Sequence, residues 1–235
     1  MLSHRPLAAL AAAVTVASGA ALALSGCSAA TPPTPVGTAV ADAHTRVAVI
    51  GDSIEAGLGL DPTEAWPELL AVDRRWGLDN LSVSGAGFVS TGADGGTFAT
   101  QVTAAIADKA QLVLIGASDN DLGTDTATVA AAMSAAVDRL HSALPHARII
   151  GYDALSGAAS DDDLAPLDAA LKAAVAAEGG TWIDLGEPYR DQDGLVQADG
   201  EHPTVAGQHA IAAVALTALD GLVEARAAST ATPAS

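Results

Sequence analysis

The chain has 235 residues, of which 28 are acidic and 10 are basic, so its formal net charge at pH 7 is −18. This balance excludes a protein that binds nucleic acid through a basic face, and it excludes a polybasic membrane-surface protein. The single cysteine excludes an internal disulfide framework and a zinc site built from several cysteines. The length suits one α/β domain with short flanking segments.

The first 26 residues have the pattern of an export signal. A start that contains Arg5 precedes an apolar run, residues 7–24, and the run is followed by Ser25-Gly26-Cys27. The end of this segment resembles a bacterial lipobox, in which the signal is cut before the cysteine and the cysteine then carries lipid. We therefore expect a lipid anchor on Cys27 and an extracytoplasmic location. The alternative is an uncleaved transmembrane helix, for which the run is short and weakly hydrophobic.

Composition divides the rest of the chain into three parts. Residues 27–45 are rich in alanine, threonine and proline without an apolar period, which predicts a flexible tether. Residues 46–223 carry regular apolar patterns and are expected to fold as one domain. Residues 224–235 are small and polar, so we expect a disordered tail.

Five short β-type runs alternate with five helical patterns in the folded part. Near-continuous apolar runs such as Val47–Ile50 and Leu112–Ile115 are typical of strands that are covered on both faces. The alternation predicts a three-layer α/β/α domain with a five-stranded parallel sheet and a site at the carboxyl ends of its strands. We expect strands at 46–51, 80–84, 111–116, 147–152 and 181–185, and helices at about 62–76, 98–109, 126–143, 163–178 and 204–222.

Two distant segments carry residues suited to nucleophilic catalysis. Ser53 directly follows the first predicted strand, where its hydroxyl would face the carboxyl edge of the sheet. Asp199 precedes His202 by three residues, so its carboxylate can bind the imidazole Nδ1–H and leave Nε2 free as a base for a serine. Each segment alone also has a simpler interpretation, because Ser53 suits a helix N-cap and the other two suit a solvated loop before a helix.

A serine that attacks an acyl group also needs hydrogen-bond donors for the developing oxyanion. The segment Asn80–Gly85 ends in a glycine, whose backbone N–H can approach a ligand closely. The segment Gly116–Leu122, after the third predicted strand, offers a side-chain amide. Both segments are also typical of turns.

In this order, the four segments resemble the GDSL, or SGNH-hydrolase, family of esterases and lipases. Gly51-Asp52-Ser53-Ile54 matches the first block of the family, with isoleucine in place of the usual leucine, and Asn80–Gly85 matches the second. The segment 199–203, Asp-Gly-Glu-His-Pro, matches the last block, D-x-x-H-P, and is the most specific piece. The resemblance spans about residues 46–222 and implies a flavodoxin-like sheet.

The resemblance also implies roles for individual residues. Ser53 would be the nucleophile, His202 its base and Asp199 the partner that orients the base. The backbone N–H groups of Ser53 and Gly85 and the side chain of Asn120 would form the oxyanion hole.

The third block departs from the G-x-N-D pattern of the family. A strict reading from Gly116 places Ser118 in the position of the asparagine. A reading shifted by two residues keeps Asn120-Asp121 together. We prefer the shifted reading, because an amide NH₂ is a better-placed donor than a hydroxyl that must rotate.

These patterns favour an extracytoplasmic, lipid-anchored serine esterase that acts on small-molecule or envelope acyl esters. No metal or organic cofactor is expected, and the turn after Ile50 has neither a P-loop nor a G-x-G-x-x-G fingerprint. One alternative is a carbohydrate O-acetyl esterase or acetyltransferase of the cell envelope that uses the same residues. Another is a noncatalytic binding lipoprotein on the same fold.

Overall fold

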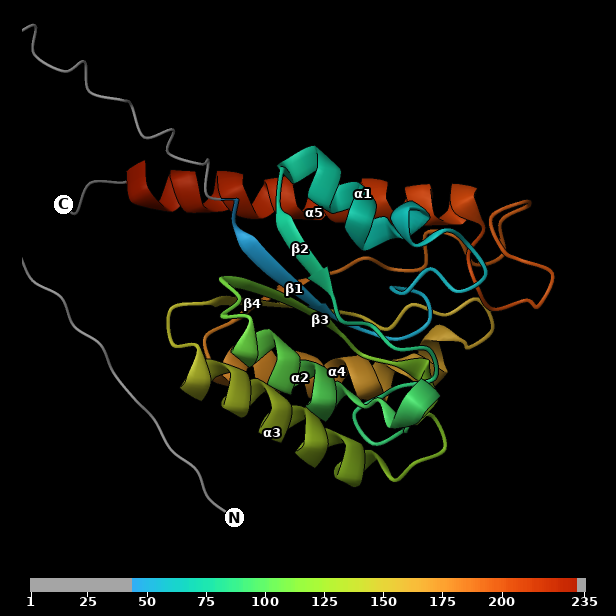
Figure 1. The fold of residues 1–235 in the computed structure, drawn as a ribbon, viewed down its shortest axis with the longest axis horizontal. Coiled ribbons are helices and arrows are strands. Elements are labelled where there is room, and N and C mark those ends of the chain that lie inside the picture. The colour runs from blue at the N-terminus through green and yellow to red at the C-terminus, as the bar shows by residue number, and fades with distance from the viewer. Residues whose placement is uncertain (1–43, 232–235) are drawn as a thin grey trace, which may run out of the picture. The chain divides into compact units, whose positions relative to one another are not determined.

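The computed structural model describes residues 44–231, which form a parallel sheet of five strands between two layers of helices (Figure 1). The predicted signal, Cys27 and nearly all of the predicted tether lie outside the described residues. The strands are β1 (Arg46–Ile50), β2 (Gly77–Asn80), β3 (Leu112–Gly116), β4 (Arg148–Tyr152) and β5 (Thr181–Ile183). The helices are α1 (Trp66–Arg74), α2 (Phe98–Ala107), α3 (Thr126–Ala143), α4 (Asp161–Ala177) and α5 (Val205–Ala231), with short 3₁₀ turns η1 (Pro62–Glu64), η2 (Ala93–Gly95) and η3 (Asp119–Asp121).

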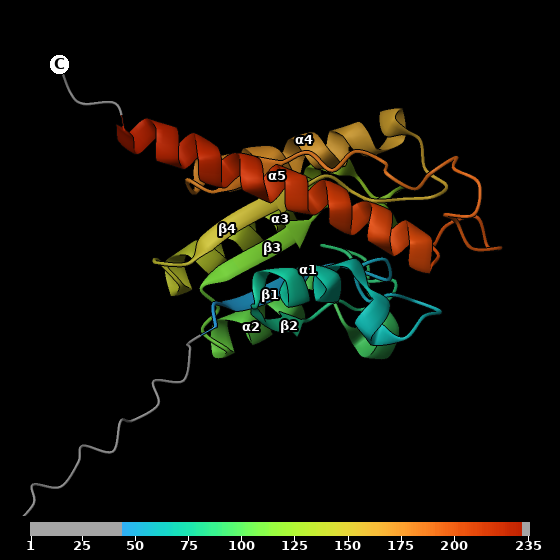
Figure 2. The ribbon, with the colours of Figure 1, turned by 90° about the horizontal axis from the view of Figure 1, so that it is seen from above.

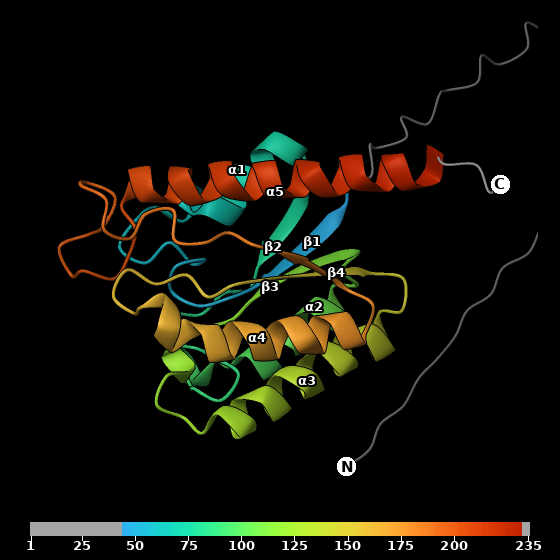
Figure 3. The ribbon, with the colours of Figure 1, turned by 180° about the vertical axis from the view of Figure 1, so that it is seen from behind.

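Each face of the sheet has its own apolar core. Helices α2, α3 and α4 cover one face, and α1 and α5 cover the other (Figures 1 and 3). Along β1, Ala48 and Ile50 pack in the first core, whereas Val47 and Val49 pack in the second. Successive side chains of a strand point to opposite faces, so a strand buried on both faces must be apolar throughout. The three-layer α/β/α architecture predicted from these runs is confirmed.

The strand order β2-β1-β3-β4-β5 explains where a ligand can bind. The chain leaves β1 toward one edge of the sheet and leaves β3 toward the other, so the loops after these two neighbouring strands diverge. Such a switch point opens a crevice at the carboxyl ends of the strands, which is where α/β sheets of this order hold their ligands. Ser53 follows β1 and Asn120 follows β3.

The second strand differs from the prediction, which placed it at 80–84. The sheet pairing of β2 begins at Gly77 and ends at Asn80, because pairing with β1 overrides the low strand propensity of glycine, aspartate and asparagine. The following segment still runs beside the end of β1: the N–H of Leu81 donates to the Val49 carbonyl at 3.0 Å, and the N–H of Val83 donates to the Gly51 carbonyl at 3.3 Å. This segment delivers the next loop to the carboxyl edge.

Four of the five helices have bounds that differ from the predicted ones. Helix α1 begins only at Trp66, after the 3₁₀ turn η1, and ends at Arg74, and α2 ends at Ala107. Helix α4 begins at Asp161 rather than at 163, because the Ser160 side chain accepts a hydrogen bond from the N–H of Asp163 and caps it. Helix α5 continues to Ala231, well into the segment predicted as a tail. Its first 20 residues, Val205–Glu224, form a segment that is long and apolar enough to cross a membrane, judged by length and composition alone. Within the domain that composition has a structural reason, since α5 packs against α1 and the sheet (Figure 2).

Candidate active site

The turn that carries Ser53 is fixed by two buried glutamines. From α2, the Gln101 carboxamide accepts a hydrogen bond from the N–H of Gly51 and donates one to its carbonyl, both at 2.9 Å. From α5, the Gln208 side chain donates to the Ile54 carbonyl at 2.9 Å. Sequence reasoning missed both residues. The available signal was a lone amide side chain on the apolar face of each helix, since a buried polar group needs partners.

Ser53, His202 and Asp199 form one continuous line of hydrogen bonds. Ser53 Oγ lies 2.9 Å from His202 Nε2, and His202 Nδ1 lies 2.8 Å from Asp199 Oδ2. The other Asp199 oxygen accepts from the backbone N–H groups of Glu201 at 3.0 Å and His202 at 3.1 Å. The Glu201 N–H and the imidazole lower the pKa of Asp199 to about 2, so its carboxylate stays ionised at neutral pH. The ionised carboxylate holds Nδ1–H as the donor and leaves Nε2 to accept the serine proton.

Ser53 and His202 open onto a cavity of about 370 Å³ that also holds the predicted oxyanion donors. Within residues 44–231, the N–H groups of Ser53 and Gly85 have no hydrogen-bond acceptor. Gly85 has φ +78°, a left-handed conformation that glycine adopts without strain. Both groups therefore remain available to an oxyanion. The residues that line the cavity are Ser53, Leu58, Ser84, Gly85, Asp119, Asn120, Glu201 and His202.

The third block places Asn120, rather than Ser118, at the cavity. The side chain of Ser118 is fully buried, and its hydroxyl donates to Asp52 Oδ2 at 2.6 Å. The Asn120 amide lies above it and donates to Ser118 Oγ at 3.1 Å and to Asp52 Oδ2 at 3.3 Å. Ser118 and Asn120, the two candidates for the asparagine position of the third block, therefore act together. Ser118 Oγ accepts a hydrogen bond from the Asn120 amide, and Asn120 lines the cavity.

Asp121, which follows this asparagine, organises the loop after Gly85. Its buried carboxylate accepts hydrogen bonds from three consecutive backbone N–H groups, those of Phe88 at 2.6 Å, Val89 at 3.0 Å and Ser90 at 2.8 Å. Three such bonds to one carboxylate fix the shape of a loop strongly. The carboxylate thus connects the loop after β3 to the loop that presents the Gly85 N–H.

Asp52 and Glu55 form a buried acidic pair beneath Ser53. The N–H of Asp52 donates to Glu55 Oε2 at 3.0 Å. Burial, followed by the charge of Glu55, raises the pKa of Asp52 to about 8, and burial raises the pKa of Glu55 as well. Asp52 therefore holds a proton more readily than an exposed aspartate does, and it acts in the packing of the turn. The pair also explains Gly51, because a Cβ there would lie 2.5 Å from Glu55 Cγ.

Glu201 connects the turn that carries His202 to the loop between β4 and α4. Its carboxylate accepts hydrogen bonds from Ser156 Oγ at 3.1 Å, the N–H of Gly157 at 3.1 Å and the N–H of Ala158 at 3.0 Å. Sequence reasoning missed this role, because Glu201 occupies a variable position of D-x-x-H. The contact spans more than 40 residues of sequence, so only the folded chain reveals it.

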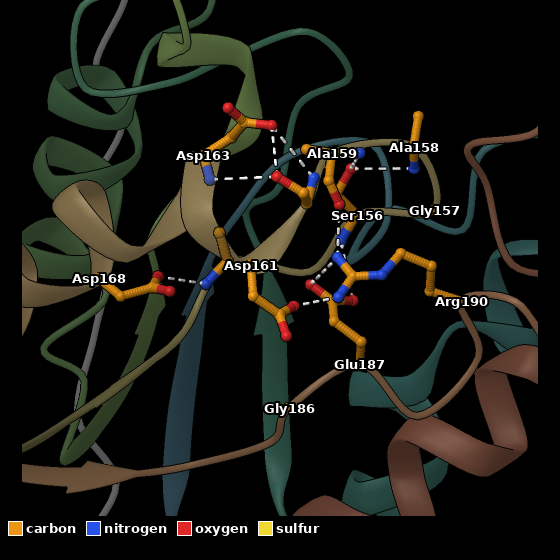
Figure 4. Close-up of polar contacts among 12 residues, drawn as sticks. Ser156, Gly157, Ala158, Ala159, Asp161, Asp163, Asp168, Gly186, Glu187 and Arg190 are labelled. Carbon is orange, nitrogen blue, oxygen red and sulfur yellow. Dashed lines mark hydrogen bonds and ion pairs between the residues drawn. The ribbon is translucent and has the colours of Figure 1, made fainter.

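The same loop is held from its other side by residues that follow β5 (Figure 4). The Arg190 guanidinium donates to the Ala159 carbonyl and to the Asp161 carboxylate, and it lies 3.3 Å from the Glu187 carboxylate. Glu187 in turn accepts a hydrogen bond from the N–H of Ser156 at 3.3 Å. The loop between β4 and α4 is therefore held by Arg190 and Glu187, which follow β5, and by Glu201 in the turn that carries His202.

The sheet order and this line of side chains define an α/β protein with a site of the serine-hydrolase type. The sequence matches the profile of the GDSL-like Lipase/Acylhydrolase family over residues 49–210, and the chain belongs to this family. The family resemblance that the four sequence blocks indicated is thereby confirmed. No curated protein sequence matches the chain significantly.

Solved structures share the fold at low sequence identity. The structure of TesA is 23% identical, covers 75% of this chain and 99% of its own, and has a TM-score of 0.61. A psychrotrophic esterase, EstA from Pseudoalteromonas sp., inhibited by monoethylphosphonate, is 18% identical over 77% of this chain and 99% of its own, with a TM-score of 0.63. A carbohydrate esterase family 2 enzyme from Corynascus thermopiles (Myceliophthora fergusii) is 21% identical over 80% of this chain and 69% of its own, with a TM-score of 0.63.

Proposed function

We propose that this protein is a serine esterase that hydrolyses acyl esters through an acyl-enzyme on Ser53. The observation that supports the proposal most directly is the line of short contacts from Asp199 through His202 to Ser53, which ends at a cavity. A serine hydroxyl becomes a useful nucleophile only when such a base takes its proton.

The reaction follows from these contacts. Ser53 Oγ attacks the acyl carbon while His202 Nε2 takes its proton, and Asp199 stabilises the imidazolium that forms. The N–H groups of Ser53 and Gly85 donate to the oxyanion, together with the Asn120 amide. His202 then gives the proton to the leaving alcohol, and the acyl group remains on Ser53. Water, deprotonated by His202, releases the acid and restores the serine.

Replacement of the nucleophile tests this proposal. Ser53→Ala should abolish hydrolysis of a short-chain nitrophenyl ester while the protein stays folded by circular dichroism. Ser134→Ala is the matched control, because Ser134 is exposed on α3 and far along the chain from the site. Turnover that persists in Ser53→Ala would contradict the proposal. If the wild type hydrolyses no acyl ester and does not react with a fluorophosphonate, a noncatalytic binding protein is the better account.

A second candidate is an O-acetyl esterase or acetyltransferase that acts on carbohydrate. Its support is the lining of the cavity, in which Leu58 is the one large apolar side chain, and the likeness in fold to carbohydrate esterases of family 2. Acetate release from an acetylated oligosaccharide, faster than hydrolysis of a long-chain ester, would favour the esterase. Appearance of acetyl groups on an added sugar acceptor would favour the transferase.

We also propose that lipid on Cys27 anchors the mature protein at the extracytoplasmic side of the membrane. The support is the sequence alone: an apolar run followed by Ser25-Gly26-Cys27. Cys27→Ala, expressed in a bacterium with lipoprotein processing, should move the protein out of the membrane fraction, whereas Ser28→Ala should leave it there. Unchanged membrane retention of Cys27→Ala would contradict the anchor.

A further inference from the structure

The catalytic cavity has an unbalanced charge. Two carboxyl groups, those of Asp119 and Glu201, line it beside Ser53 and His202. No lysine or arginine is among the described residues that line it. The presence of the nucleophile and its base marks the cavity as the place where a substrate binds. The negative charge of the cavity wall therefore acts electrostatically on the substituents of the ester that binds there.

Glu201 is already occupied by the protein. Its two oxygens accept hydrogen bonds from Ser156 Oγ and from the N–H groups of Gly157 and Ala158. These donors balance much of the Glu201 charge and fix its position. A carboxylate with this many internal partners has little capacity left for a ligand.

Asp119 is in a different situation. Its side-chain hydrogen-bond partners are the Ser156 hydroxyl, which also donates to Glu201, and the Glu201 carboxylate itself. Burial, followed by the negative charges of Asp52 and Glu201, raises the pKa of Asp119 to about 7. A cation placed beside this carboxyl would relieve the repulsion and favour its ionised form.

We propose that Asp119 is a specificity-determining residue that contacts a positively charged group of the substrate, so that the enzyme prefers short acyl esters of cationic alcohols. The inference rests on the proposed esterase function. Asp119 lies between Ser118 and Asn120, the two residues that compete for the asparagine position of the third block. The preference follows from the charge of the cavity wall, and it needs no change in the chemistry at Ser53 and His202.

The test uses two acetate esters of the same shape, acetylcholine and 3,3-dimethylbutyl acetate, which differ in charge at one quaternary atom. Above pH 7, where Asp119 is largely ionised, kcat/KM of the wild type should be about tenfold higher for the cationic ester. Asp119→Asn should bring this ratio close to one while the neutral ester is still hydrolysed. Asp138→Asn, on the exposed side of α3, changes the net charge equally and should keep the wild-type ratio.

The outcomes separate this inference from the function on which it rests. Equal kcat/KM for the two esters in the wild type, or an unchanged ratio in Asp119→Asn, would overturn the inference and leave the esterase in place. Turnover of neither ester, with no reaction toward a fluorophosphonate, would overturn both. The dependence of the wild-type kcat/KM on ionic strength is an independent test, and it can be used even if Asp119→Asn is unstable. High ionic strength should reduce kcat/KM for the cationic ester and leave the neutral ester unchanged, and an unchanged ratio would count against the inference.

Discussion

Glu201→Ala should destabilise the protein and slow catalysis without a comparable effect on KM. The substitution removes the acceptor of three donors, the Ser156 hydroxyl and the N–H groups of Gly157 and Ala158. A hydrogen bond to a charged group is worth about 1.5–3 kcal/mol, but the exposed Ala158 N–H regains water. Two bonds at the lower end of this range remain, from the buried hydroxyl and from the half-buried Gly157, so the loss amounts to about 3 kcal/mol.

The kinetic effect follows from the position of Glu201 next to His202. Without the hydrogen bonds of Glu201, the turn that carries His202 samples conformations in which Nε2 is not aligned with Ser53, and kcat should fall about tenfold. Glu201→Gln keeps one acceptor oxygen and should give an intermediate loss in both measurements. The assays are urea unfolding and initial rates of acetate-ester hydrolysis, with Glu224→Ala, at an exposed position of α5, as the control. The reasoning fails if Glu201→Ala has the stability and the kcat of the wild type.

Two further predictions concern the other carboxylates of the site. Asp199→Asn should lower kcat by about a hundredfold. This is less than the roughly 10⁴-fold loss for a fully buried triad aspartate, because the Asp199 side chain is 49% exposed. A loss of kcat below threefold, measured in initial rates, would contradict the role of Asp199. Asp52 has a folded-state pKa of about 8, above its unfolded value of 3.8, so its contribution to stability is complete below the unfolded value and is lost as pH rises to about 8. The free energy of unfolding of the wild type, measured in urea, should therefore fall by up to about 1.4 kcal/mol per pH unit relative to that of Asp52→Asn over this pH range. Parallel pH profiles of the two proteins would refute this.

The sequence predicted the parts of the fold that depend on burial. The near-continuous apolar runs of β1 and β3 are typical of strands covered on both faces, and the structure has them in the interior of the sheet. The edge strand β2 was placed three residues too late, since Gly77-Leu78-Asp79-Asn80 pairs with β1 in spite of its composition. The end of α5 was predicted too early, because an alanine-rich segment is compatible with a helix as well as with a disordered tail.

The candidate site was predictable where a residue type is tied to a chemical role. Ser53, His202 and Asp199 are the residue types that acyl transfer needs, and the structure brings their side chains together. The supporting residues were not predictable in this way. Gln101, Gln208 and Glu201 act through contacts between segments far apart in sequence, and a single amide or carboxylate in a helix or loop does not indicate its partner.

The central claim is that Ser53 is a nucleophile activated by His202. Reaction of the full chain with a fluorophosphonate, followed by intact-mass measurement and peptide mapping, tests it most directly. The account predicts one adduct on the peptide that contains Ser53, much slower labelling of His202→Ala, and none on Ser53→Ala. A folded wild-type protein that takes no adduct, or takes it at another residue, would contradict the account.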